Sequence, residues 1–182
     1  MGKKTDRLDS SHIAFIGRQK MFFSATATAE SHINLSPKGL DTFRVLDEGR
    51  VAYLDLTGRG NEAAAHIAAD GRMTIMFCAF EGPPLILRIY GRGQVHLRGN
   101  PDYLELLARG FEGVEPPGTR QIIVIDVEMV LTSCGFGVPH YQFVGDRPSL
   151  PRWAEEKGEE ALAEYRRKNN TVSLDGLPVS VT

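Results

Sequence analysis

Successive strand-like segments, separated by short turns, are the feature that most constrains the fold of this chain. The segments TFRVLD and RVAYLDL flank residues 47–49, an acidic turn with glycine that is typical of a hairpin. Three further segments follow, RMTIMFCAF, LILRIYGRGQVHL and TRQIIVIDVEMVLTSC, and they are rich in residues that favour strands. Only two short helical patterns, residues 61–69 and 100–109, interrupt the series. This arrangement predicts an antiparallel β-barrel of about six strands.

The start of the barrel is predicted upstream of these segments. MFFSATATA and SHINLS favour two paired strands, and we expect Pro37 and Gly39 to end the second one, because proline cannot donate to a ladder. Asp9, Ser10 and Ser11 are suitable N-caps for a short helix that ends near Lys20. Residues 1–6 are charged, and we expect them to be frayed.

The composition of the chain changes near its C-terminus. Residues 149–182 contain the charged helical run RWAEEKGEEALAEYRRKNN and the tail SLDGLPVSVT. The apolar stripe of this run is narrow, with Trp153, Leu162 and Tyr165, and such a helix is not stable in isolation. We therefore predict a barrel domain over residues 1–148 and a helical extension over residues 149–182 that packs on the barrel or on a partner subunit.

Charge, cysteine usage and apolar run length exclude several classes of protein. The formal net charge of −2 supplies no broad positive field for nucleic acid. Apolar runs such as IIVIDV are far shorter than the roughly 20 residues that a membrane-spanning helix needs. Cys78 and Cys134 are lone thiols, and no apolar leader follows Met1. We expect a cytoplasmic protein with no membrane or nucleic-acid partner.

Two polar turns, each with one cation, lie at the ends of predicted strands. Lys38 belongs to SPKG, and Arg59 belongs to the TGRG turn (residues 57–60), directly before the helical pattern at 61–69. Free N–H groups and the dipole at a helix N-terminus favour an anion. We predict that the two turns close on one phosphate group of a flat aromatic ligand.

Two neighbouring charged residues have more than one interpretation. Alternation along the LRIYG strand places Arg88, Tyr90 and Arg92 on one face, which lines either a ligand or water. Asp55 either joins the binding site or is a strand-end carboxylate that the TGRG turn satisfies. Lysine and arginine beside turns are common on protein surfaces, so the cluster of these residues is more informative than any single member.

Other site chemistries have no support in the residue spacing. The five histidines are scattered without a metal-ligand spacing, so we predict no metal site. No serine lies in a GxSxG setting, and GRGN lacks the glycine spacing of a Walker or dinucleotide motif.

Several motifs occur in the order in which a known family has them. INLSPKG, YLDLTGRGNEAAAHIAADGRMTIMF and ILRIYGRGQVHL resemble the flavin-binding core of the pyridoxamine 5′-phosphate oxidase-like family, whose split β-barrel binds FMN at a dimer interface. SCGFGVPHYQF, RWAEEKG and KNNTVSLDGLP resemble a subgroup with this C-terminal extension. The resemblance covers roughly residues 10–178. It implies a mainly β (α+β) protein, a six-stranded antiparallel split β-barrel with short flanking helices and a C-terminal helix, which binds FMN as a homodimer.

The resemblance also implies which residues contact the cofactor. The ribityl phosphate or the flavin edge would be contacted by Ser36 and Lys38 of SPKG and by Thr57, Arg59 and Asn61 of the following turn. Arg88 holds the place where the family has a cofactor-facing basic residue. The predicted cofactor-binding residues are Ser36, Pro37, Lys38, Asp55, Thr57, Arg59, Asn61 and Arg88. No catalytic residue is assigned, because the flavin itself carries the redox chemistry.

The leading functional hypothesis is an FMN-dependent oxidoreductase of unknown substrate, with a small-molecule substrate or an electron donor such as NAD(P)H. Its rivals are a flavin- or heme-binding stress or storage protein without turnover, a deazaflavin-dependent reductase, and a barrel that serves only as an interaction module. Pyridoxamine phosphate oxidases carry a Ser-Arg-Lys run where this chain has TGRGNE, and an Arg-Gln pair where it has LILRIYG. These departures argue against oxidation of pyridoxamine phosphate.

Overall fold

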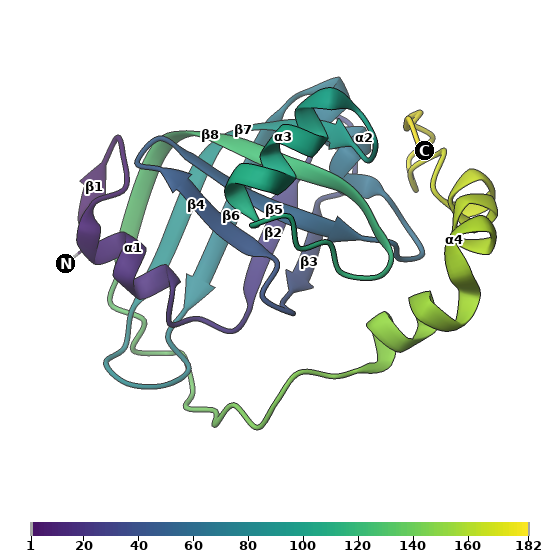
Figure 1. The fold of residues 1–182 in the computed structure, drawn as a ribbon. Coiled ribbons are helices and arrows are strands. Elements are labelled where there is room, and N and C mark those ends of the chain that lie inside the picture. Colours follow the sequence, from purple (N-terminus) through teal and green to yellow (C-terminus); the bar gives the residue numbers. More distant parts are fainter. Residues whose placement is uncertain (1, 182) are drawn as a thin grey trace.

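The computed structural model describes residues 2–181, which form one mainly antiparallel sheet with four helices (Figure 1). The strands pair in the order β3-β2-β6-β7-β8-β5-β4, and β1 pairs with β8 beside this path. The sheet is therefore not closed, as in a split barrel. The strands are β1 (Lys4–Thr5), β2 (Phe22–Thr26), β3 (Asn34–Lys38), β4 (Phe43–Asp47), β5 (Arg50–Leu56), β6 (Arg72–Cys78), β7 (Ile86–Leu97) and β8 (Thr119–Ser133). The helices are α1 (Ser10–Ile16), α2 (Glu62–Ala69), α3 (Pro101–Gly110) and α4 (Ser149–Asn169).

The predicted class of fold is confirmed, but the sheet has eight strands rather than six. One additional strand is β1, which lies in the segment that we expected to be frayed. Lys4 pairs with Leu131 and Thr5 pairs with Val130. This edge of β8 is free because β5 pairs with β8 only from Thr119 to Asp126. A two-residue strand has no detectable period, so sequence alone does not predict it.

Strand β3 runs through Pro37, which pairs with Phe23 of β2. The prediction that Pro37 ends this strand was wrong. β3 is the last strand at one edge of the sheet. Proline is tolerated in an edge strand, because a residue there can lack an N–H without losing a ladder bond. The strand ends after Lys38, and the chain then turns through Leu40 and Asp41, which have φ values of 60° and 53°.

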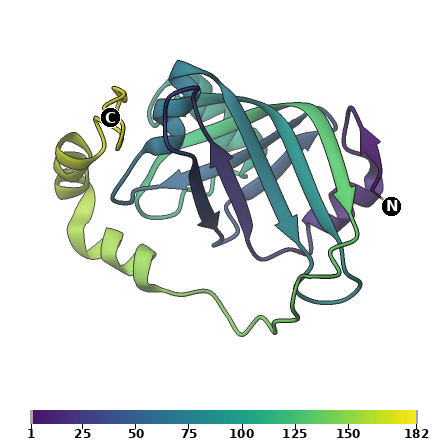
Figure 2. The same ribbon diagram turned by 180° about the vertical axis from the view of Figure 1, so that it is seen from behind.

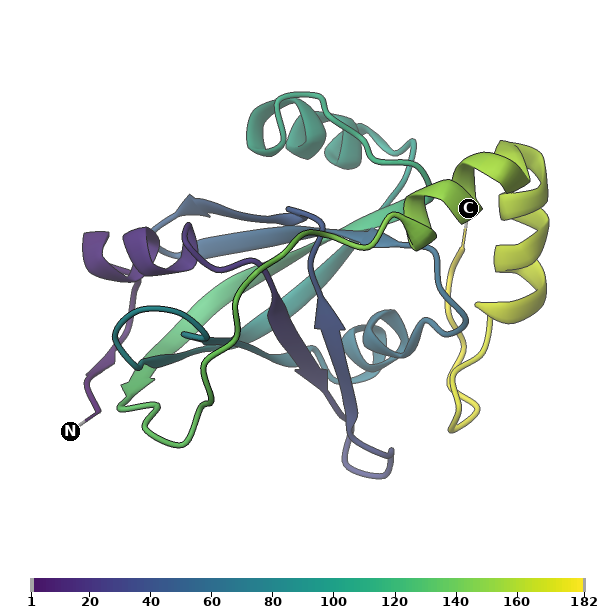
Figure 3. The same cartoon turned by 90° about the horizontal axis from the view of Figure 1, so that it is seen from below.

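Two apolar clusters hold the sheet together. The larger one fills the inner side of the curved sheet, with Phe22, Phe77 and Ile125 among its members. The smaller one lies under α3, where Tyr103 and Phe111 are buried against β5 and β8. Figure 3 shows α3 over one face of the sheet. β5 and β8 are therefore buried on both faces, which explains their nearly continuous apolar sequences.

The side of β3, β2, β6 and the adjoining parts of β7 and β8 that faces away from the larger cluster has no helix over it in the described part of the chain (Figure 2), although α3 covers the same side of β8 at Ile122 and Val124. We call this surface the outer face. Its cross-strand row Pro37, Phe23, Met76, Arg88 and Leu131 lies on it, because paired residues in a sheet point to the same side. The next row, with Phe22, Phe77 and Leu87, points into the core.

The C-terminal extension follows β8 through a long connection, residues 134–148, and then forms α4 and a tail (Figure 1). α4 changes direction at Gly158, whose φ of 73° and ψ of 165° are not helical. Ala154, Leu162 and Arg166 of α4 are buried. None of the helices between residues 2 and 181 has the length and apolar character needed to cross a membrane.

Candidate functional site

A buried carboxylate, Asp55, is the centre of a polar network at one end of the barrel. Asp55 lies near the end of β5 and is 1% exposed. Its two oxygens accept hydrogen bonds from Lys38 Nζ at 2.7 Å, Arg120 Nε at 2.9 Å and Gln121 Nε2 at 2.8 Å. Burial alone raises the pKa of Asp55, but the charges of Arg120 and Lys38 outweigh it and hold the pKa well below its usual range. Asp55 is therefore ionised and satisfied by side chains of β3 and β8, not by the TGRG turn.

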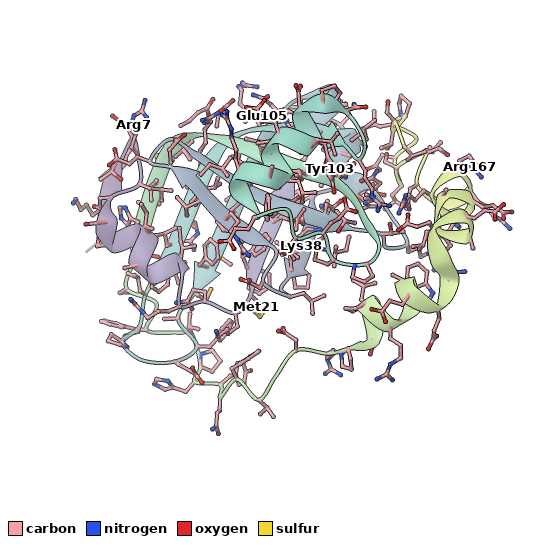
Figure 4. All side chains as sticks on the ribbon, viewed as in Figure 1. Arg7, Met21, Lys38, Tyr103, Glu105 and Arg167 are labelled. Atoms are coloured by element: carbon pink, nitrogen blue, oxygen red, sulfur yellow. The ribbon has the colours of Figure 1, made fainter. Side chains whose placement is uncertain are left out.

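Lys38 is not the freely displayed cation that the sequence suggested. It pairs with Phe22 in the inner row, so its side chain points into the barrel toward Asp55. Its side chain is only 20% exposed, and Nζ lies 5.2 Å from the centre of the Tyr53 ring. Figure 4 shows Lys38 in the middle of the molecule. The positive charge of Lys38 is thus largely paired with the Asp55 carboxylate inside the barrel.

The TGRG turn is anchored at its first residue. Thr57 is fully buried, and both its backbone N–H and its hydroxyl donate to the carbonyl of Gly118, at 2.8 and 2.7 Å. The Thr57 hydroxyl also accepts a hydrogen bond from Arg166 Nε of α4 at 3.0 Å. Arg59 is exposed, and no interaction of its guanidinium is present among residues 2–181. Arg59 is therefore available to a ligand at this turn.

Three successive carbonyls of the turn are bound by two side chains from distant parts of the chain. Asn170 Nδ2 donates to Gly58 O at 3.1 Å and to Arg59 O at 3.0 Å. Arg120 Nη1 donates to Gly60 O and to Asn170 Oδ1, both at 2.9 Å. Asn170 is fully buried. The conformation of the turn consequently depends on β8 and on the residue that follows α4.

Asn61 links the turn to the Asp55 network. It is the residue before α2, but its side chain makes no cap hydrogen bond; Oδ1 accepts instead from Gln121 Nε2 at 2.9 Å. Its Nδ2 is buried and has no partner within residues 2–181. Ser24 Oγ, Tyr53 OH and His66 Nε2 are buried without a partner in the same way. A buried donor without a partner is costly, so a water or a ligand atom is expected at Asn61.

The turn lies among charged side chains of both signs. Burial lowers the pKa of Arg166, and the nearby cations Arg98 and Arg120 lower it further, while Glu159 and Glu115 oppose them. Arg59 is the exposed cation of the turn itself. An anion at the turn would reduce the repulsion among the cations.

Arg88 lies on the outer face, on the opposite side of the sheet from Lys38. Its row contains Pro37, whereas Lys38 belongs to the next row. Arg88 Nη1 donates to Ser133 Oγ at 3.1 Å. Pro37 and Arg88 are separated by three strand spacings, which is about 14 Å. The structure therefore does not bring Arg88 together with Lys38 within one chain.

An open hollow of about 630 Å³ lies on the outer face. Ala25, Thr74 and Tyr90 form its floor, and Arg72 and Glu128 contribute charged groups at its side. The volume is within the range of about 300–1,000 Å³ that is typical of small-molecule sites.

The eight predicted residues are thus not brought together in one place. Lys38, Asp55 and Asn61 belong to the inner network, Thr57 and Arg59 belong to the TGRG turn, and Pro37 and Arg88 lie on the outer face. Ser36 points to the inner side of β3 but donates to Asn34 of its own strand and is not joined to the Asp55 network. Sequence analysis missed Arg120, Gln121, Arg166 and Asn170. Two polar residues at the start of the apolar run RQIIVIDV were a usable signal, because Gln121 is the direct cross-strand partner of Asp55.

Comparison with known proteins identifies the family. A sequence model of the family described as pyridoxamine 5′-phosphate oxidase matches residues 8–134. The chain belongs to the pyridoxamine 5′-phosphate oxidase family. The pyridoxamine 5′-phosphate oxidase family protein ustO of Aspergillus flavus is 40% identical over an alignment of 180 residues, and the match covers 88% of this chain and 71% of ustO. Family membership confirms the resemblance of the core motifs; the similarity of the C-terminal extension to a subgroup stays a prediction.

Solved structures support the same fold. The HupZ protein of Group A Streptococcus has a TM-score of 0.56 and 20% identity, over 69% of this chain and 98% of its own. A candidate pyridoxamine 5′-phosphate oxidase of Lactobacillus delbrueckii has a TM-score of 0.54 and 20% identity, over 69% of this chain and 94% of its own. At this identity the likeness concerns the fold alone. The family is typically flavin-binding and often dimeric.

Proposed function

We propose that this protein binds FMN and works as an oxidoreductase, as a homodimer with the flavin between its subunits. The observation that carries the proposal is the cationic TGRG turn before α2, in a chain whose family is typically flavin-binding. The substrate class is left as a small molecule, with NAD(P)H as the candidate electron donor.

The residues at the turn fit a phosphate group. The N–H groups of Arg59, Gly60 and Asn61 make no hydrogen bond within residues 2–181, and the unpartnered Asn61 Nδ2 is a further donor. The exposed Arg59 supplies a mobile positive charge, and α2 contributes the positive end of its dipole. Bound FMN would supply hydride or electron transfer, while these residues bind and orient its phosphate.

The outer face supports the dimer in this proposal. Ile33 is 77% exposed and Leu35 is 62% exposed, and both belong to or adjoin β3 at the rim of this face. Large exposed apolar side chains at one place are typical of protein interfaces. A second copy on this face would bring its own groups to Pro37, Arg88 and the hollow. In this arrangement residues 1–148 form the cofactor-binding domain and residues 149–182 complete its TGRG turn.

The first experiment is the absorption spectrum of the purified protein, with mass spectrometry of any small molecule released on denaturation. An oxidised-flavin spectrum and the mass of FMN are the expected results. Heme absorption would instead identify the protein as heme-binding, and the mass of a deazaflavin would identify a deazaflavin as its cofactor. A colourless protein that also fails to bind added FMN contradicts the proposal. Reduction of the bound flavin by NAD(P)H in a stopped-flow experiment then tests the oxidoreductase activity.

Arg59→Ala tests the site itself. Arg59 makes no ion pair among the described residues, so its loss should weaken FMN binding roughly tenfold and leave the melting temperature nearly unchanged. Arg109→Ala is the matched control, since Arg109 is 82% exposed on α3 and pairs only with Glu105. Equal FMN affinities of both variants, measured by quenching of flavin fluorescence, would remove Arg59 from the site. Lys38→Ala is less suitable, because it also breaks the ion pair with Asp55.

A further inference from the structure

We infer that the C-terminal segment, residues 166–175, is the device that shapes the TGRG turn for phosphate, with Asn170 as its principal positioning residue. The inference rests on the proposed function, because it concerns the same FMN phosphate. It assigns a role to a part of the chain that lies outside the match to the family model, which ends at residue 134.

The first argument is the direction of the peptide groups. In a planar trans peptide, the carbonyl of one residue and the N–H of the next point in opposite directions. The carbonyls of Gly58, Arg59 and Gly60 all point to Asn170 or Arg120. The N–H groups of Arg59 and Gly60 must therefore point away from Asn170, and that of Asn61 away from Arg120. Asn170 thus orients two of the N–H donors of the turn to the side where a ligand can reach them.

The second argument is the spacing of the side chains on the last helical turn. Arg166 and Asn170 are four residues apart, so they lie on the same side of the helix and its end. Arg166 holds Thr57 and Asn170 holds the next two residues of the turn. The neighbouring Arg167 is exposed, and Figure 4 shows it on the outside of α4. Asn169 donates only to Tyr165 O of its own helix, at 2.9 Å.

The third argument is the treatment of a competing negative charge. Glu62 is in the first turn of α2, where its carboxylate would repel a phosphate. The Leu174 N–H donates to both oxygens of Glu62, at 3.2 and 3.0 Å. Asp175 is held in turn by His32, whose backbone N–H donates to it at 2.9 Å. The tail therefore restrains the Glu62 carboxylate by a hydrogen bond to its oxygens.

The test compares FMN with riboflavin, which has the same ring system but no phosphate. Asn170→Ala should weaken FMN binding at least about tenfold, the factor that corresponds to about 1.4 kcal/mol. Riboflavin binding should change by less than about twofold, because the ring does not use the turn. Asn169→Ala is the matched control and should leave both affinities unchanged. A loss of affinity for both ligands in parallel would indicate a merely structural role and would overturn the inference.

Hydrogen exchange gives a second readout that does not depend on flavin. Without Asn170 the carbonyls of Gly58 and Arg59 lose their donor, so the hydrogen-bonded amides on either side of the turn, Thr57 N–H and Ala65 N–H, should exchange faster in Asn170→Ala than in Asn169→Ala. Exchange in β6 and β7 should be the same in both variants if the barrel is intact. Unchanged exchange at the turn would overturn the inference. A wild-type protein that binds neither FMN nor riboflavin would contradict the proposed function instead, and the exchange result would still decide the role of Asn170.

Discussion

The inner network around Asp55 and the outer face around Arg88 show two ways in which one chain treats its polar residues. In the inner network, Asp55 is fully partnered, and a residue from the C-terminal segment completes the cluster. On the outer face, Arg88 has one hydrogen bond among the described residues, and Leu35 at the β3 edge of this face is 62% exposed. Pro37 and Lys38 are adjacent in sequence but belong to different regions. Strand alternation thus divides a single sequence cluster into one region completed within the chain and one that is left open for a partner.

Removal of the central carboxylate should have the largest effect. Asp55→Ala leaves Arg120 and Lys38 near each other without a counter-charge, and loss of one member of a buried ion pair costs about 3–5 kcal/mol. The free energy of unfolding, obtained by denaturant titration, measures this loss of stability. Asp41→Asn is the control, because Asp41 is 87% exposed, pairs with Arg44 alone among residues 2–181, and has a positive φ that asparagine tolerates, so the loss of its charge should cost less than about 1 kcal/mol. Equal losses in the two variants would contradict the special role of the inner network.

A charge on the outer face should break the dimer. Leu35→Glu should weaken self-association by roughly a hundredfold, about 2.7 kcal/mol, because a carboxylate would be buried without a partner at the interface. Leu104→Glu is the control, since Leu104 is 55% exposed on α3, away from the outer face. Sedimentation velocity at several concentrations reports the association. A Leu35→Glu protein that is as dimeric as the control would place the interface elsewhere.

The acid limb of the stability curve should report Asp55. The pKa of Asp55 is lowered in the folded protein. Its contribution to stability is therefore complete above its pKa in the unfolded chain, about 3.9, and is lost as the pH falls from there toward its pKa in the folded protein. In that window the group steepens the decline of stability by up to about 1.4 kcal/mol per pH unit. Asp55→Asn should therefore show a shallower decline between about pH 4 and pH 2 than the wild type. Parallel curves for the two proteins would show that Asp55 does not titrate as proposed.

The smallest effect is expected at the exposed pair that fixes the tail. His32 Nδ1 and Asp175 Oδ1 are 2.6 Å apart, and this hydrogen bond, helped by the negative charge, raises the pKa of His32. Because the pKa of His32 is raised, the pair contributes its full stabilisation below the ordinary histidine pKa of about 6.5. This stabilisation is lost as the pH rises through the pKa of His32 in the folded protein. NMR titration of His32 should show a pKa that returns toward its ordinary value in Asp175→Asn. An unchanged pKa in that variant would exclude the pair in solution.

Local sequence patterns were sufficient for most of the sheet. The acidic turn predicted the hairpin of β4 and β5, and alternation on β7 placed Arg88 and Tyr90 on one face and Leu87 and Ile89 on the other, as the pairing with β6 shows. The alanine-rich run ending at Asp70 predicted α2 within one residue at its start. These features depend on contacts between residues close together in the sequence, so local sequence patterns predict them.

The partners of the polar residues depend on the tertiary structure. Asp55 and Arg120 are 65 residues apart, and Asn170 bonds to a turn more than a hundred residues before it. Their contacts follow from the pairing of β5 with β8, where Asp55 faces Gln121, and from the position at which α4 ends. A shift of one residue in that register would turn Asp55 to the other face of the sheet. Strands, turns and family are therefore properties of short stretches of this chain, whereas the identity of the groups that neutralise a charge or shape a turn is decided only when distant strands have paired.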